Sequence, residues 1–132
     1  MRFFWSEDHR TWRVQSKGGE TMELGVPLDG SGDTSALESD PASAARIFRW
    51  NLARQYDAQA GVGAPVNVVR YRYIASGATA YLTDIYDTPP ASNASAATVS
   101  AYAHHTRLRY ANRPDATFSY RRGWRVDQAL RL

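Results

Sequence analysis

The last residues of the chain read Arg113-Pro-Asp-Ala-Thr-Phe-Ser-Tyr-Arg-Arg-Gly-Trp-Arg-Val-Asp-Gln-Ala-Leu-Arg-Leu132. Aromatic and charged side chains alternate here with the period of two that is typical of a β-strand. Arg122-Gly123 interrupts the alternation, and glycine can adopt the positive φ that a tight reversal requires. We therefore predict two strands, at 116–121 and 124–132, joined as a hairpin.

The rest of the chain shows the same short alternating segments, separated by clusters of turn-forming residues. Strands are predicted at 3–6, 11–16, 21–25, 66–74, 80–86 and 101–111. Residues 47–56 alternate only in part, so periodicity leaves strand and helix open there. Including these residues, the count is about nine strands.

Two long stretches, near 26–43 and 87–100, are rich in Pro, Gly, Ser, Asp and Asn and are predicted to be loops. Residues 57–65 are expected to form a shorter turn. Ser39-Asp40-Pro41 could cap a brief helix over 42–46, with Pro at its first position. We expect an all-β fold in which residues 1–132 form a single antiparallel meander, as an open or sandwich-like sheet with at most a very short helix. Nearly every connection is too short for a helical crossover.

The composition restricts the class of protein. With 132 residues, 43% of them hydrophobic, the chain can bury a modest core. It has no cysteine, so disulfides and thiolate metal sites are excluded. No apolar run approaches the roughly twenty residues of a membrane span, and the N-terminus turns acidic too soon for a signal peptide. We expect no membrane partner.

Positive charge is concentrated near the C-terminus. Seven arginines lie between Arg107 and Arg131, with only Asp115 and Asp127 to offset them. One interpretation is a nucleic-acid-binding or carbohydrate-binding surface, in which aromatic rings stack on bases or sugars. The nucleic-acid version would use the following residues: Arg107, Arg109, Arg121, Arg122, Arg125, Tyr110, Tyr120 and Trp124. The other interpretation, which the strand spacing favours, is that guanidinium groups stack on aromatic rings along the solvent face of a sheet.

Few residue patterns suggest catalysis. His104 and His105 are adjacent in a predicted strand, so they face opposite sides and cannot share one metal. Asp84 and Asp87 could act as an acid–base pair, but strand and turn positions favour structural roles. No nucleophile elbow or phosphate-binding glycine loop is present. We predict no catalytic residue, no metal and no cofactor.

A longer pattern runs through nearly the whole chain. It consists of Trp12-Arg-Val14, Trp50-Asn-Leu52 ahead of Asp57, Tyr71-Arg-Tyr73, Tyr81-Leu82-Thr-Asp-Ile85-Tyr86, and finally Arg113, Asp115, Tyr120, Gly123, Arg131 and Leu132. In order and approximate spacing, this pattern resembles the virulence-plasmid B protein (SpvB) family and the related B subunits of Tc insecticidal toxins. The terminal block carries the most specific part of the resemblance.

The resemblance implies a non-catalytic segment from the N-terminal shell region of such a protein. In those assemblies, β-rich segments and Rhs/YD-repeat strands enclose a toxic effector. The partners would be neighbouring β-segments of the same shell, and an isolated piece would tend to self-associate. The protein would be secreted as part of a larger toxin, or cytoplasmic before release. Some SpvB-type proteins also carry an ADP-ribosyltransferase domain, which requires a late glutamate; the last glutamate here is Glu38.

Overall fold

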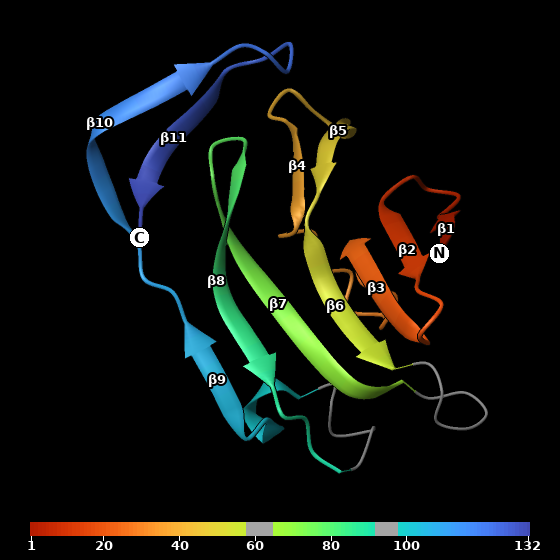
Figure 1. The fold of residues 1–132 in the computed structure, drawn as a ribbon. Helices are drawn as coiled ribbons and strands as arrows, with labels where there is room; N and C mark the ends of the chain where they lie inside the picture. Colours follow the sequence, from red (N-terminus) through yellow and green to blue (C-terminus); the bar gives the residue numbers. More distant parts are fainter. Residues whose placement is uncertain (58–64, 92–97) are drawn as a thin grey trace.

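The computed structural model describes residues 1–57, 65–91 and 98–132. It confirms the predicted all-β, antiparallel class: eleven strands form one open sheet of seven strands and two smaller sheets of two strands each (Figure 1). Within the described residues the only helical element is a 3₁₀ turn, Val99–Ala101.

The large sheet begins as an N-terminal meander of β1 (Arg2–Trp5), β2 (Thr11–Gln15) and β3 (Glu20–Gly25). It continues through β6 (Leu52–Asp57) and the long hairpin of β7 (Val66–Ser76) and β8 (Thr79–Asp87). It ends at β9 (His104–Arg107), so that β1 and β9 are its two edges. These segments are rich in β-branched and aromatic residues, as half-buried strands generally are.

Between β3 and β6 the chain leaves the large sheet to form a separate hairpin of β4 (Leu37–Asp40) and β5 (Ser43–Trp50). Asn51 lies between β5 and β6, where the chain returns to the large sheet. Its backbone N–H donates to the Ala36 carbonyl (2.8 Å), and its own carbonyl accepts from the Gly25 N–H (2.8 Å). One residue therefore joins the end of β3, the start of β4 and the junction between β5 and β6.

The C-terminal ribbon consists of β10 (Ala111–Ser119) and β11 (Val126–Arg131), which pair only with each other. The hairpin predicted from the terminal residues is therefore present, but its strands cover 111–119 and 126–131 instead of the predicted 116–121 and 124–132. Gly123 lies in its reversal with φ of 85°, and its N–H donates to the Tyr120 carbonyl (2.9 Å). Pro114 lies in a stretch of β10 where the register with β11 shifts, since proline offers no N–H to a ladder.

Three sequence-based expectations need correction. The brief helix predicted at 42–46 is wrong, because these residues turn into and begin β5; the Asp40 carboxylate caps the β4–β5 turn by accepting from the Ala42 N–H (2.9 Å). The predicted loop near 26–43 contains β4. Finally, 101–111 is not one strand, because only β9 lies between the 3₁₀ turn and β10.

The segment 47–56, left open between strand and helix, is extended on both sides of Asn51. The predicted turn at 57–65 lies largely outside the described residues, and the loop near 87–100 lies partly outside them.

The apolar core is small. The buried hydrophobic residues are Val14, Ala36, Ala53, Val68, Ala78, Tyr102 and Val126. The largest side chains that are fully buried are instead Glu23, Glu38 and Thr21. Carboxylates in such positions must be paired, because an isolated buried charge costs several kcal/mol.

Gly25 should be difficult to replace. Its φ is +87°, and a Cβ there would lie 2.3 Å from the Arg10 carbonyl oxygen and 2.7 Å from Cδ1 of Trp50. We expect Gly25→Ala to lower the free energy of unfolding by about 3 kcal/mol or more, from backbone strain plus overpacking. Gly30→Ala is the matched control, since Gly30 has φ of +80° with nothing within 4 Å, and should lose about 1 kcal/mol. Equal losses for the two variants in urea unfolding would show that the close approach at Gly25 is unimportant.

Candidate functional site

One row of side chains crosses the entire large sheet. The Cα partners in neighbouring strands run from β1 to β9 in the order Phe4, Arg13, Glu23, Arg54, Arg70, Tyr86 and His105. Directly opposed residues lie on the same face, so these seven side chains form one band, which we call the cross-sheet row. At its ends, the Arg13 guanidinium lies 5.9 Å from the centre of the Phe4 ring, and His105 stacks on Tyr86 with ring centres 4.3 Å apart.

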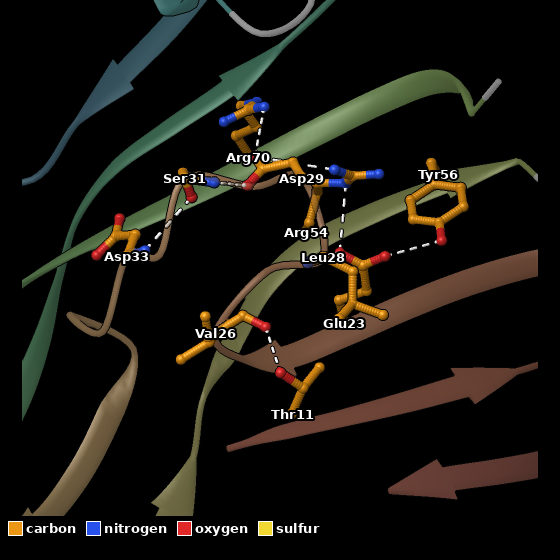
Figure 2. A network of polar contacts seen from close by, with 10 residues as sticks. All are labelled: Thr11, Glu23, Val26, Leu28, Asp29, Ser31, Asp33, Arg54, Tyr56 and Arg70. Carbon is orange, nitrogen blue, oxygen red and sulfur yellow. Dashed lines mark hydrogen bonds and ion pairs between the residues drawn. The ribbon is translucent and has the colours of Figure 1, made fainter. Parts of the chain in front are cut away.

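The centre of the row is a buried ion cluster (Figure 2). Glu23, 1% exposed, accepts hydrogen bonds from the Tyr56 hydroxyl (2.8 Å) and the Leu28 N–H (2.9 Å). Its carboxylate also lies 3.5 Å from Nε of Arg54. Burial, followed by the hydrogen bond to Glu23, raises the pKa of Tyr56 above its usual range.

The loop after β3 completes this cluster by placing Asp29 over the sheet. Asp29 Oδ2 lies 2.7 Å from Nη2 of Arg70 and 3.8 Å from Nη1 of Arg54. The short contact to Arg70 is an ion pair without hydrogen-bond geometry. Burial would raise the pKa of Asp29, but the hydrogen bonds from Ser31 and the two guanidinium charges outweigh it and lower that pKa. The loop is therefore held to the sheet electrostatically.

A second buried carboxylate, Glu38 in β4, connects three parts of the chain. It accepts from the Ala80 N–H at the start of β8 (3.2 Å) and from Nη1 of Arg49 in β5 (3.5 Å). It also forms an ion pair and hydrogen bond with Arg122 in the turn of the C-terminal ribbon. Around this pair, the Arg122 guanidinium stacks 4.2 Å from the centre of the Phe48 ring, and Trp124 packs edge-on against Phe48. The ribbon is thereby docked on the β4–β5 hairpin.

The histidines and aspartates singled out in the sequence meet at the β8–β9 edge as two separate pairs. His104 Nδ1 lies 2.5 Å from Asp87, and His105 Nε2 lies 2.7 Å from Asp84. Burial opposes the ionisation of Asp84, but hydrogen bonds from Thr83, His105 and Arg107 lower its pKa. No group of three or more His, Cys, Asp or Glu side chains suited to a metal occurs in the part of the chain that the structure describes.

The residues of the sequence pattern lie on strands and turns and contact one another in several places. Trp12 and Trp50 are joined through Trp5, whose ring centre lies 4.3 Å and 5.7 Å from theirs. The Tyr73 hydroxyl donates to the Leu52 carbonyl (2.8 Å), and burial raises the pKa of Tyr73 to about 12.

The β7–β8 hairpin pairs Tyr71 with Ile85, and Tyr73 with Leu82. Val14 is buried in β2, Asp57 ends β6, and Tyr86 belongs to the cross-sheet row. In the ribbon, Arg113 and Asp115 form an ion pair (2.9 Å), while Arg131 ends β11 opposite Ala111.

Most of the side chains proposed for nucleic-acid binding have partners within the protein. Arg122 pairs with Glu38, Arg125 with Asp127 (2.9 Å) and Arg107 with Asp84 (3.3 Å). The Tyr110 hydroxyl donates to the Leu82 carbonyl, and Trp124 packs against Phe48. Tyr120, at 62% exposure, is the one ring of the three proposed that is exposed to solvent. This arrangement favours arginine stacking within the protein over a continuous phosphate-binding surface.

The charges that are buried or nearly buried were not predicted from the sequence: Glu23, Asp29, Glu38, Arg54 and Arg70. A signal for some of them was present, since Glu23 stands between Met22 and Leu24, and Arg70 follows Val68 and Val69, so that each charge lies next to apolar residues in a strand and requires a partner if buried. The identity of the partners depends on the strand order, which alternation alone does not give. Asp29 could not be predicted, because its loop reaches the sheet only through the tertiary fold.

Comparisons of the chain with models of protein families, with curated proteins and with solved structures find no match. Among the described residues, no helix has the length and apolar character needed to cross a membrane.

Asp29→Asn should weaken the fold at neutral pH and reduce its acid sensitivity. The pKa of Asp29 is lower in the folded protein than in the unfolded chain, where it is about 4. The ionised carboxylate therefore stabilises the fold above about pH 4, and this stabilisation is lost as the pH falls through the pKa that Asp29 has in the folded state. Removing the charge leaves Arg70 uncompensated, at an expected cost of about 3 kcal/mol at pH 7.

The measurement is urea unfolding between pH 7 and pH 3, with Asp33→Asn as control. Asp33 accepts from the Ser35 N–H (2.8 Å), a role that asparagine can fill. Similar stability–pH profiles for the parent and for Asp29→Asn would contradict the electrostatic role of Asp29.

Proposed function

We propose that the chain is a non-catalytic structural segment of a toxin-complex shell of the SpvB/TcB-like kind, and that it assembles with neighbouring β-segments. The observation that carries the proposal is the exposed apolar edge of the large sheet. All four residues of β1 are exposed, and Phe3 (63%), Phe4 (46%) and Trp5 (48%) are among them. An edge strand has unpaired backbone N–H and C=O groups, so it can pair with another strand.

The two edges of the sheet differ in a way that supports this assignment. The β9 edge is polar throughout (His104, His105, Thr106 and Arg107) and offers no apolar side chain to a partner strand, whereas β1 has one charged residue, Arg2, beside three aromatic ones. The β1 edge offers large apolar side chains on both faces, because successive residues of a strand point to opposite sides. A partner strand added to β1 would bury Phe3 on one face and Phe4 on the other.

The use of the titratable side chains also supports a structural role. Glu23, Asp29 and Glu38 are neutralised by arginines, and each histidine of β9 is paired with one aspartate. Such pairs hold strands and loops together across the sheet. In the proposed role the segment is delivered as part of a larger secreted toxin, and it is cytoplasmic before release.

The coding sequence on either side of this segment tests the proposal directly. Flanking YD repeats or a β-propeller region would support assembly into a toxin shell. An open reading frame that encodes this segment alone would contradict it.

The β1 edge makes a separate prediction for the isolated chain. We expect concentration-dependent self-association, and we expect Phe3→Lys to shift the chain toward monomer by placing a charge on the pairing edge. Ile74→Lys is the control for an added surface charge, because Ile74 is 52% exposed but pairs with Tyr81 of β8, away from the β1 edge. Light scattering coupled to size-exclusion chromatography measures the mass. A parent chain that stays monomeric at high concentration would count against the proposal.

A further inference from the structure

A groove of about 290 Å³ lies between the β4–β5 hairpin and the C-terminal ribbon. Phe48 and Arg49 line it from β5, and Phe118 lines it from β10. Arg121 and Arg122 line it from the turn of the ribbon. Phe48 is 46% exposed and Phe118 is 59% exposed, so the two rings remain accessible to a partner.

The charge in this groove is not balanced by the protein. Arg49 and Arg122 share the single carboxylate of Glu38, which leaves one positive charge in excess. Arg121 is exposed and forms no ion pair with any side chain in the ranges that the structure covers, so it adds a second. By contrast, the neighbouring Arg46 and Arg125 are each matched by an aspartate. Among the described residues, no Asp or Glu lines the groove.

We propose that this groove binds an extended acidic peptide segment. One apolar side chain of the peptide packs between Phe48 and Phe118, and flanking carboxylates bind Arg121 and Arg49. Residues of opposite charge across an interface steer association and fix its register. The inference does not depend on assembly into a toxin shell, since no residue of β1 lines the groove.

Peptide is favoured over nucleic acid by three features of the groove. Its size is at the lower end of ligand pockets, so it fits a side chain with its neighbours rather than a stretch of bases. Its unbalanced charge is two, whereas polynucleotide binding usually depends on many phosphate contacts. Its borders, β5 and β10, each have one strand partner among the described residues, so each has backbone groups free to pair with an extended peptide.

The test is fluorescence anisotropy with the full chain and a labelled peptide of alternating Glu and Val residues. A peptide with Lys in place of Glu and a single-stranded oligonucleotide are the comparison probes. We expect the acidic peptide to bind, the basic peptide not to bind, and the oligonucleotide to compete poorly for the acidic peptide. Equal binding of both peptides, or tighter binding of the oligonucleotide, would overturn the proposal.

Two variants locate the site. Arg121→Ala should weaken binding of the acidic peptide about fivefold, the upper range for an exposed ion pair. Phe118→Ala should weaken it about tenfold through lost apolar contact. Arg109→Ala removes an exposed arginine outside the groove and should leave the affinity unchanged. If Arg109→Ala and Arg121→Ala weaken binding equally, the interaction is general charge attraction and the groove is not the site. Failure here leaves self-association through β1 unaffected, so the two proposals are judged separately.

Discussion

The pairing of Glu23 with Arg54 is the interaction on which the rest of the sheet depends. The apolar core is built mostly from alanine and valine, so it contributes limited hydrophobic stabilisation. Glu23 and Arg54, at 1% and 7% exposure, cannot be left unpaired at that depth. A slip of one residue between β3 and β6 would move one of them to the opposite face. The ion pair therefore specifies the register at the centre of the sheet, and Asp29 and Arg70 extend it to the covering loop and to β7.

Glu38 is a second buried carboxylate that is paired with arginine, but the consequence of its pairing is different. There the carboxylate holds together segments that no shared sheet connects: the β4–β5 hairpin, the start of β8 and the C-terminal ribbon. Because one carboxylate serves two arginines, positive charge remains at the surface beside exposed phenylalanine rings. The aromatic β1 edge and the basic groove thus both remain available to partners, as the proposed role in assembly would require.

The sequence predicted the strands better than their arrangement. Alternation located the two strands of the C-terminal ribbon and those of the β7–β8 hairpin, because turn residues such as Gly123 and Gly77 separate the two strands of each hairpin. It failed at 42–46, where Pro41 suggested the start of a helix but the chain instead forms β5 and pairs with β4. It also placed 101–111 in one strand, although the chain leaves the sheet after Arg107. These misses share a cause: strand order and pairing are long-range, whereas caps, turns and periodicity are local. For the same reason the arginine–carboxylate partners were not foreseen, although the stacking of arginine on aromatic rings was.

A double-mutant cycle on Glu23→Gln and Arg54→Met measures the central interaction most directly. Urea unfolding of the parent, both single variants and the double variant gives the coupling free energy between the two side chains. We expect the double variant to lose less stability than the sum of the losses of the two single variants. The difference, which is the coupling free energy, should be about 1 to 3 kcal/mol. Additive losses, with a coupling below about 0.3 kcal/mol, would mean that the two charges do not stabilise the sheet through each other.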